Sequence, residues 1–435
     1  MIDGADTIVA VATPPGVGGI GVLRLSGPRA LELGAHIVGP LPPPRRALHR
    51  HFRAPQGESI DDGLVLVFPG PASYTGEDVV ELQGHGSPVL LQRLQEVAVG
   101  LGARLARPGE FTERAFLNGR MDLAQAEAVA DLIHAQTAAA ARLAHNSLDG
   151  ALAETIDPVA REIRDLRVLI EAEIDFGETD LESAVAPEVA RRAGELARSV
   201  DALVARMRPA RIFTTGMRLA LVGAPNVGKS SLMNRLADAE VAIVTEVAGT
   251  TRDVLRAPIA IDGIPVELID TAGLRDSDDA VERIGIERAR SAAAAADMIL
   301  EIRDLTRPEA RADLPDLPGI PVLQVWNKAD LASGGPPGGL RVSAATGAGL
   351  DALRAAIRAE MGLAGGQEQR FSVRARHLDT LAQAAACLHR ILPESPSDLI
   401  AEDLRLGERA LEQLLGRGDH EALLGAIFAG FCIGK

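Results

Sequence analysis

The chain has 435 residues, of which 47% are hydrophobic, so it is long enough for two or three domains with buried cores. Its net charge of -15 and its single Trp and single Tyr exclude nucleic-acid binders that rely on an overall positive field or on rows of stacking rings. Its two cysteines, Cys387 and Cys432, exclude a disulfide framework, and we expect a cytoplasmic protein without a signal peptide or a membrane span.

The first half of the chain falls into two segments. Residues 1–120 are predicted to form an N-terminal α/β domain, because β-rich runs alternate there with turns rich in Gly and Pro. These runs lie at 7–11, 19–25, 63–68 and 78–82. Residues 121–215 are predicted to be helical, because apolar residues recur there at steps of three and four.

The second half begins with short apolar strands that alternate with loops and helices, which is typical of a parallel α/β sheet. This P-loop domain covers 216–364, with strands predicted at 218–222, 265–269, 298–303, 322–326 and 340–342. Residues 365–435 are helical again. Because the ends of a domain often lie close together, we expect one helical-bundle domain interrupted by the inserted P-loop domain. Two separate small bundles are the alternative.

Lysine is nearly absent from this chain. Lys229, Lys328 and Lys435 are the lysines among 45 basic residues, and every other one is arginine. An ammonium on a flexible stem is not interchangeable with a planar guanidinium. The three lysines are therefore candidate site residues.

Residues 223–230 read Gly-Ala-Pro-Asn-Val-Gly-Lys-Ser, between a predicted strand and a predicted helix. In that context the backbone N–H groups of a P-loop surround phosphate oxygens, and the helix N-terminus adds a favourable dipole. Lys229 would reach the β- and γ-phosphates, and the Ser230 hydroxyl would bind Mg²⁺. The motif predicts a nucleoside triphosphatase.

Residues 327–330 read Asn-Lys-Ala-Asp and indicate which base is bound. Asp330 can accept hydrogen bonds from N1–H and the 2-amino group of guanine, while Asn327 can contact the other edge of the purine. Adenine has neither donor, so it would leave the carboxylate unpaired. The sequence therefore predicts GTP as the nucleotide.

Further motifs complete a pattern that resembles a GTPase G-domain. Asp270-Thr-Ala-Gly273 would sense the γ-phosphate and Mg²⁺, 343–345 would back the base, and Thr251 in the switch I segment would give Mg²⁺ a second hydroxyl. Leu274 stands where many GTPases carry a water-orienting Gln. The predicted GTP-binding residues are Asn226, Val227, Gly228, Lys229, Ser230, Ser231, Thr245, Glu246, Val247, Ala248, Gly249, Thr250, Thr251, Asp270, Thr271, Ala272, Gly273, Asn327, Lys328, Ala329, Asp330, Ser343, Ala344 and Ala345.

Together with segments outside the G-domain, these motifs make the chain resemble the MnmE (TrmE) family of tRNA-modification GTPases over nearly its whole length. The G-domain motifs alone would also fit ribosome-assembly GTPases. The segments that carry the resemblance are 19–27, 76–86, 107–119, 122–127, 249–253 and the terminal Phe-Cys-Ile-Gly-Lys at 431–435.

The resemblance implies an N-terminal domain that forms the homodimer and binds a formyl- or methylene-tetrahydrofolate. The folate contacts carried over are Arg24, Glu81, Arg120 and Lys435. A basic cluster suits the carboxylates of the glutamate tail, and a carboxylate can accept from the amino groups of the pterin. Arg120 departs from the lysine that we expect in many relatives.

The resemblance also implies that GTP is hydrolysed with K⁺ bound, when two G-domains meet. The K⁺ ligands would be Asn226, Thr245, the backbone of Val247, and Thr250. Glu282 would be catalytic by orienting the attacking water. A solvent-exposed carboxylate at a helix start is the alternative interpretation of Glu282.

The function implied is the installation of an aminomethyl or carboxymethylaminomethyl group at C5 of the wobble uridine, position 34, in certain tRNAs. The implied partner is the FAD-binding protein MnmG (GidA), which forms a heterotetramer with the homodimer and brings NADH chemistry. A regulatory GTPase switch in ribosome assembly is the alternative, and a folate enzyme gated by GTP is a third possibility. His85 is expected to be a turn residue, and Cys432 a small buried one.

Overall fold

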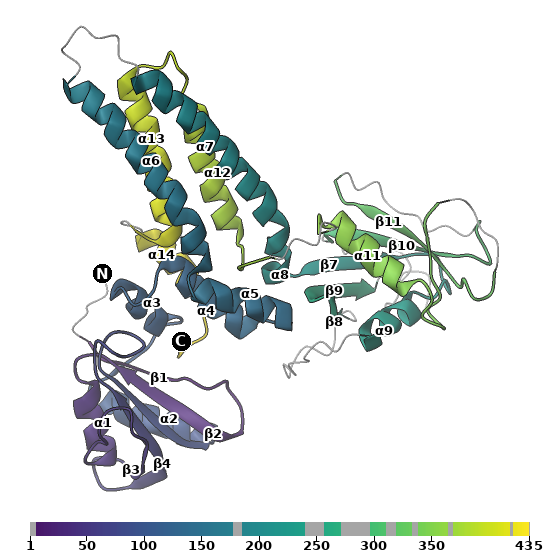
Figure 1. Ribbon diagram of the computed structural model, residues 1–435. Coiled ribbons are helices and arrows are strands. Elements are labelled where there is room, and N and C mark those ends of the chain that lie inside the picture. The colour runs from purple at the N-terminus through teal and green to yellow at the C-terminus, as the bar shows by residue number, and fades with distance from the viewer. Residues whose placement is uncertain are drawn as a thin grey trace, which may run out of the picture. The chain divides into compact units, whose positions relative to one another are not determined.

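The computed structural model describes residues 6–176, 185–239, 256–270, 296–309, 319–332, 338–363, 369–417 and 421–434 (Figure 1). The chain forms two compact units. The first, here unit 1, combines Met1–Ala130 with Glu412–Lys435, and the second, unit 2, is Asp131–Leu411. The two ends of the chain therefore belong to the same unit.

Unit 1 is built on a six-stranded sheet of order β3-β4-β5-β2-β1-β6. Its strands are β1 (Ile8–Val11), β2 (Gly18–Ser26), β3 (Leu48–Arg53), β4 (Ser59–Phe68), β5 (Val79–Gly86) and β6 (Arg104–Leu105). Neighbours are antiparallel except β1 and β6. Alternate apolar residues such as Leu23, Val65 and Leu82 are fully buried with residues of α1 (Ala30–Val38) and α2 (Pro88–Gly100). The period of two in these strands therefore defines the face that the helices cover.

Three details of this sheet differ from the sequence prediction, and the first is the short edge strand β6, which was not predicted. Strand β3 was not predicted, because Phe52 is its single buried residue and the others are polar or exposed, as an edge strand allows. His85 lies in β5 and not in a turn, since the flanking Gly84 and Gly86 pair with β2. The expectation of a turn was therefore wrong.

The C-terminal segment packs on the helices that follow the sheet of unit 1. Helices α3 (Glu110–Leu117), α4 (Leu123–His134) and α14 (Glu421–Phe428) contribute to one apolar cluster, which includes Phe428 and Phe431. Gly109, in the left-handed region at φ 68°, lets this segment approach, because a β-carbon there would lie 2.9 Å from the Phe428 carbonyl oxygen.

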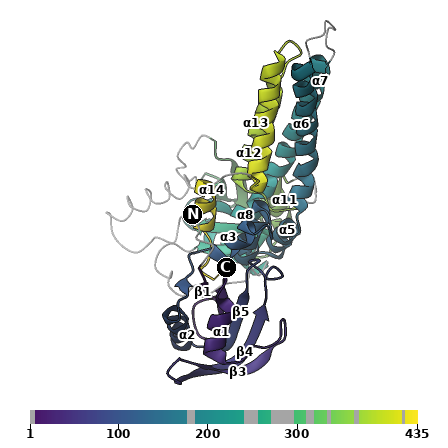
Figure 2. The ribbon, with the colours of Figure 1, turned by 90° about the vertical axis from the view of Figure 1, so that its left-hand side faces the viewer.

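Unit 2 contains a bundle of long helices, α6 (Ala151–Phe176), α7 (Val185–Met207), α12 (Ala375–His389) and α13 (Ser397–Leu415), with the shorter α5 (Ala138–Leu148) at its base. The helices run side by side in Figure 2. Their predicted apolar stripes, such as Ile156, Ile163 and Ile170, are fully buried. Glu408 of α13 accepts from Arg164 of α6 at 2.6 Å, so helices before and after the insertion share one bundle. None of the described helices is long and apolar enough to cross a membrane.

The inserted domain carries a second six-stranded sheet, of order β12-β11-β10-β7-β9-β8. After η1 (Arg208–Ala210) and α8 (Arg211–Thr215), which precede the domain, its elements are β7 (Met217–Val222), α9 (Lys229–Ala239), β8 (Arg256–Ile261), β9 (Ile264–Asp270), β10 (Met298–Asp304), β11 (Val322–Asn327), β12 (Leu340–Arg341) and α11 (Leu350–Glu360). All pairs are parallel except β8 with β9. The predicted fold class, α/β plus a helical bundle interrupted by a P-loop domain, is confirmed.

Strand β8 was not predicted, because Pro258 lies in its middle. Proline cannot donate to a sheet, so it lowers the strand signal of its segment. At the edge of the sheet β8 has β9 as its one neighbour, and the missing donor is tolerated there.

A buried ion cluster lies beneath α3 in unit 1. The Arg114 side chain is 2% exposed and pairs with Asp6 at 2.5 Å, Glu77 at 3.1 Å and Glu110 at 3.2 Å. Burial alone would raise the pKa of the Asp6 and Glu110 carboxyls, but hydrogen bonds from Arg104 and Arg114 hold both below their ordinary values. Both carboxyls are therefore ionised at neutral pH.

Replacing Arg114 by Met should destabilise unit 1 by about 3 kcal/mol at pH 7, the lower end for removal of one partner of a buried ion pair, because Glu77 loses this cation while Asp6 and Glu110 keep Arg104. Since the lowered pKa values of Asp6 and Glu110 add stability that is lost as pH falls through them, the deficit of the variant should shrink below their ordinary values of 3.8 and 4.5, toward about pH 3. Urea unfolding at both pH values measures this. Arg29→Met, which removes an exposed pair with Glu32, is the control and should change little. An equal deficit at both pH values would contradict the ionic explanation.

Candidate active site and a second polar cluster

The predicted P-loop connects β7 to α9. Asn226 and Gly228 have positive φ angles of 63° and 93°, so the backbone turns through the left-handed region before the helix begins at Lys229. A β-carbon at Gly228 would lie 2.3 Å from Asn327 Nδ2. Glycine is therefore required where the 327–330 loop passes the P-loop.

The ammonium of Lys229 is held by the P-loop backbone. Its Nζ donates to the carbonyl oxygens of Gly223 at 2.7 Å and Ala224 at 3.0 Å, and the residue is 7% exposed. Ser230 and Ser231 follow in the first turn of α9 and are exposed. A cation, backbone N–H groups and a hydroxyl are thus gathered at one helix N-terminus, which is the donor set for a phosphate chain.

Asn327, the last residue of β11, joins two loops. Its Nδ2 donates to the Val227 carbonyl oxygen at 2.9 Å, and its Oδ1 accepts from the Ala344 N–H at 3.0 Å. The side chain is 2% exposed, so both bonds are made in a water-poor interior. The structure therefore brings the P-loop, the 327–330 loop and the 343–345 loop together.

The carboxylate of Asp330 is oriented by Ser343. The Ser343 hydroxyl donates to Asp330 Oδ1 at 2.6 Å and accepts from the Thr346 N–H at 3.1 Å. Because Ser343 is fully buried, its hydroxyl has a fixed position from which to hold the carboxylate. Ala344 and Ala345 continue the same loop, so 343–345 supports the 327–330 loop from behind.

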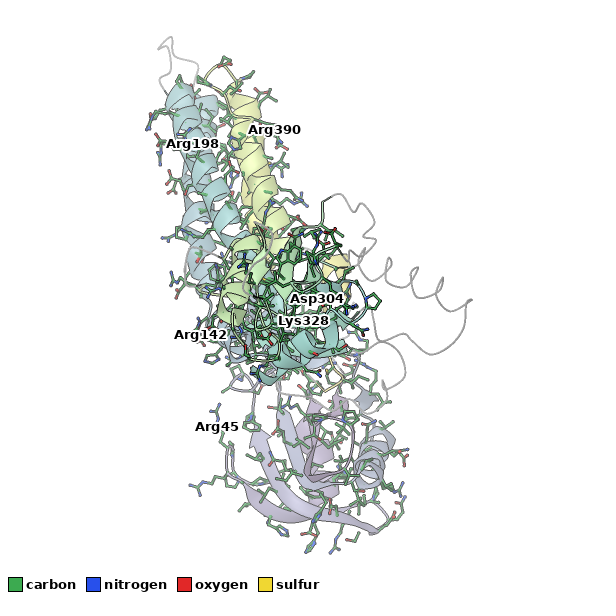
Figure 3. The ribbon with its side chains drawn as sticks, turned by 90° about the vertical axis from the view of Figure 1, so that its right-hand side faces the viewer. Arg45, Arg142, Arg198, Asp304, Lys328 and Arg390 are labelled. Atoms are coloured by element: carbon green, nitrogen blue, oxygen red, sulfur yellow. The ribbon has the colours of Figure 1, made fainter. Side chains whose placement is uncertain are left out.

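Asp304, which the sequence analysis did not single out, contacts the 327–330 loop at Lys328. Its Oδ2 accepts from Lys328 Nζ at 2.7 Å (Figure 3). Asp304 ends β10, the strand beside β11, and the carboxyl ends of parallel strands are where ligand-binding residues of α/β sheets gather. The place of Asp304 at the end of a predicted parallel strand could therefore have marked it as a candidate site residue from the sequence.

Several predicted site residues lie outside the described residues or have no described side chain. They are the switch I residues Thr245, Glu246, Val247, Ala248, Gly249, Thr250 and Thr251, the motif residues Asp270 (side chain), Thr271, Ala272 and Gly273, the catalytic candidate Glu282, and Lys435. Their roles stay predictions.

The second polar cluster lies in unit 1, where the C-terminal segment contacts β2. Arg24 of β2 and Glu81 of β5 are paired across the sheet, with Arg24 Nη2 at 2.8 Å from Glu81 Oε1. Arg24 Nη1 also donates to the Gly434 carbonyl oxygen at 3.4 Å. Gly434 directly precedes Lys435, so the structure brings the C-terminus to two of the predicted folate residues.

Two aromatic residues that the sequence analysis missed flank Arg24. The guanidinium carbon lies 5.6 Å from the Tyr74 ring centroid and 5.7 Å from that of Phe111. Burial raises the pKa of the Tyr74 hydroxyl, which shares a hydrogen bond of 2.8 Å with Thr112. The sequence offered one signal for Tyr74, because it is the single tyrosine of the chain and could have been singled out as a candidate site residue.

Arg120 is not brought into this pair. Among the described residues no contact joins Arg120 to Arg24 or Glu81, and Arg120 lies instead beside Gly76, where a β-carbon would be 3.4 Å from its Cγ. Cys432 is exposed, which corrects the expectation that it is buried. The C-terminal segment is held there through its backbone, since the Cys432 carbonyl oxygen accepts from the Gly109 N–H at 3.3 Å.

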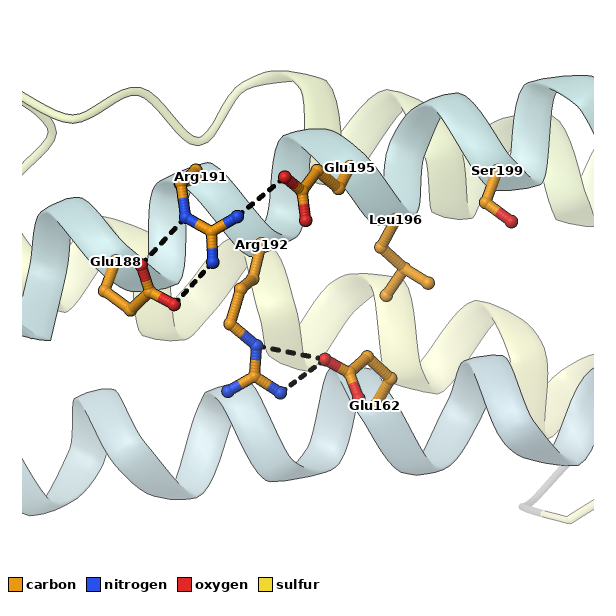
Figure 4. A pocket seen from close by; sticks show the side chains of 7 residues that line it. All are labelled: Glu162, Glu188, Arg191, Arg192, Glu195, Leu196 and Ser199. Carbon is orange, nitrogen blue, oxygen red and sulfur yellow. Dashed lines mark hydrogen bonds and ion pairs between the residues drawn. The ribbon is translucent and has the colours of Figure 1, made fainter.

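A cavity of about 490 Å³ lies between α6 and α7 (Figure 4). It is lined by Glu162, Glu188, Arg191, Arg192, Glu195, Leu196 and Ser199. Arg192 pairs with Glu162, and Arg191 pairs with Glu188 and Glu195, so both cations are already neutralised by neighbouring carboxylates. We assign these pairs to the solvated surface of the bundle.

Comparison with known proteins agrees with the two parts of this architecture. A model of the GTP-binding protein TrmE N-terminus matches residues 7–120, and a model of the MnmE helical domain matches residues 123–432. The tRNA modification GTPase MnmE of Neisseria meningitidis serogroup B is 47% identical over 448 residues, covering 100% of both chains. The protein of that name from Halorhodospira halophila is 48% identical over 454 residues, covering 100% of this chain and 96% of its own.

Among solved structures, Era from Aquifex aeolicus is 23% identical and covers 42% of this chain and 69% of its own, with a TM-score of 0.26. A similarity of that size supports no inference. The family models and the full-length relatives are sufficient by themselves to assign the family. The chain therefore belongs to the MnmE (TrmE) family of tRNA modification GTPases.

Proposed function

We propose that this protein is a tRNA modification GTPase that binds GTP between the P-loop and the 327–330 loop. One observation carries the proposal: Lys229, Asn327 and Asp330 converge at the carboxyl ends of strands in one sheet, held by 2.6 to 3.0 Å hydrogen bonds. The names of the full-length relatives support the same activity.

Selection of guanine would follow from the fixed carboxylate of Asp330. Ser343 uses one side of that carboxylate, which leaves acceptor capacity for the N1–H and 2-amino donors of guanine. Asp330 is exposed in the structure and a bound base would cover it, so adenine would leave a charged acceptor covered and unpaired, which is costly. Asn327 would meet the other edge of the purine while it anchors both neighbouring loops.

Cation binding and hydrolysis would use oxygen donors around the P-loop. Ser230, exposed in the first turn of α9, is a hydroxyl of the kind that Mg²⁺ accepts, and we infer that Thr251 is its second ligand. The K⁺ ligands we infer are Asn226, Thr245, the Val247 backbone and Thr250. These cations would supply positive charge to the phosphates, and Glu282 would orient the attacking water.

The second polar cluster would bind a 5-formyl- or 5,10-methylene-tetrahydrofolate. Glu81 can accept from the amino groups of a pterin, while Arg24 and Lys435 can pair with carboxylates of the glutamate tail. The contact between Arg24 and Gly434 supports a role for the last residue in this site. Arg120 would join only if its side chain turns from Gly76 toward the pair.

The proposed reaction installs an aminomethyl or carboxymethylaminomethyl group at C5 of the wobble uridine of certain tRNAs, in the cytoplasm. We infer that the chain acts as a homodimer with the FAD-binding MnmG (GidA), which would supply FAD, NADH and much of the tRNA-binding surface. The net charge of -15 supports this division, because a strongly acidic protein binds a polyanion poorly by itself.

Asp330→Asn should weaken GTP binding by about a hundredfold or more and favour xanthosine triphosphate, because the amide can donate to the xanthine carbonyl. Calorimetric titration with both nucleotides measures the switch. Arg341→Gln, an exposed change on the neighbouring β12, is the matched control. Unaltered preference for GTP would remove Asp330 from its proposed role.

Glu282→Ala should slow GTP hydrolysis by about a hundredfold, since positioning of a catalytic base or its water contributes that much or more. The dissociation constant for GDP should stay within about twofold, because the residue would act on the water and not on the nucleotide. Single-turnover hydrolysis and GDP titration separate the two effects. Loss of affinity would make Glu282 a structural residue.

Removing Lys435 should weaken binding of 5-formyl-tetrahydrofolate by about tenfold, as expected for one charge-assisted hydrogen bond. Calorimetric titration of the intact and truncated proteins measures this. Arg29→Gln, which breaks an exposed pair in the same domain, should bind folate like the intact protein. If the intact protein binds no folate, a regulatory switch in ribosome assembly becomes the better account.

A further inference from the structure

The backbone of Lys328 adopts an unfavourable conformation within the 327–330 loop, here called the base-reading loop after its proposed role. Its φ angle is 65°, in the left-handed region that residues with a β-carbon rarely occupy. Strain of this kind persists when the surrounding structure over-determines it, and it is common at ligand-binding sites. Some contact must therefore hold Lys328 in place.

The contacts that hold it come from β10 and the turn after it. Lys328 Nζ donates to Asp304 Oδ2 at 2.7 Å, and the carbonyl oxygen of the preceding Asn327 accepts from the Leu305 N–H at 3.0 Å. On the other side, the Ala329 N–H donates to the Val342 carbonyl oxygen at 3.0 Å. The left-handed residue is thus fixed at its side chain and at both neighbouring peptide groups.

Asp304 is itself held firmly. Its Oδ1 accepts from the Thr306 N–H at 2.9 Å and from the Thr306 hydroxyl at 2.6 Å, so its two oxygens have separate partners. The Asp304 side chain is 6% exposed, against 30% for Lys328. Burial alone would raise the pKa of this carboxyl, but hydrogen bonds from Lys328 and Thr306 hold it below its ordinary value. The carboxylate is charged at neutral pH.

We propose that Asp304 is a positioning residue for nucleotide binding: by fixing Lys328, it sets the loop conformation that presents Asn327 and Asp330 to the base. Asp304 pairs in register with Asn327 across β10 and β11, so its carboxylate reaches the loop just beyond Asn327. This inference rests on the proposed guanine site. It adds a residue that belongs to none of the sequence motifs.

A conservative substitution tests the inference in the full-length protein. Asp304→Asn keeps the shape of the side chain and removes its charge. It should raise the dissociation constants of GDP and GTP about tenfold, as for one charge-assisted hydrogen bond, and leave kcat at saturating GTP within about twofold. The substitution should therefore raise KM and leave kcat nearly unchanged.

Lys328→Gln removes the same pair from its more exposed side, so it keeps the test valid if Asp304→Asn does not fold. The two substitutions together should weaken GDP binding less than the product of their separate effects, because both remove one interaction. Glu301→Gln is the matched control: Glu301 lies on β10, is 7% exposed and pairs with Arg303 at 2.6 Å, away from the loop. It should leave both KM and kcat unchanged.

Asp330→Asn in the same series separates the two hypotheses. If it exchanges guanosine for xanthosine nucleotides while Asp304→Asn and Lys328→Gln bind GDP normally, the positioning role of Asp304 is overturned and the guanine site stands. Equal weakening by Asp304→Asn and Glu301→Gln would also overturn it, since a general loss of stability would explain both. If Asp330→Asn keeps its preference for GDP, the guanine site itself fails.

Discussion

The proposed nucleotide site depends on one buried amide, that of Asn327. Its nitrogen donates to Val227 and its oxygen accepts from Ala344, so rotation of the side chain would break both bonds where little water could replace them. Gly228 leaves room for this amide against the P-loop. The P-loop and the 327–330 loop are therefore linked to each other, and the position of either constrains the other.

A small number of contacts likewise holds the C-terminal segment in unit 1. The Cys432 carbonyl oxygen accepts from Gly109, and the Gly434 carbonyl oxygen accepts from Arg24, so the C-terminal segment is held mainly through its backbone. Backbone contacts of this kind constrain where the last residues lie without demanding particular side chains from them.

The bundle of unit 2 explains how an inserted domain is tolerated. Glu408 of α13 accepts a hydrogen bond from Arg164 of α6 and forms an ion pair with Arg167 of the same helix, and Ser147 shares a hydrogen bond with Ser372 across the insertion. Helices that precede and follow the inserted sheet thus share one bundle, and the sheet closes its own core around residues such as Leu219 and Leu300. Each part can satisfy its hydrophobic surface independently, which is the condition for insertion.

The sequence by itself determined the G-domain motifs, the helical periodicity and the strands with strong alternation, because each is a pattern of residues that lie close together in the sequence. It did not reveal the edge strands β3 and β8, whose polar residues and Pro258 are acceptable only because each has a single neighbour. It did not reveal Asp304, Tyr74 or the exposure of Cys432 either. These depend on segments far apart in the chain: Asp304 lies 24 residues from Lys328, and Arg24 lies 410 residues from Gly434. Local patterns carry no information about such pairs, so only the tertiary structure decided them.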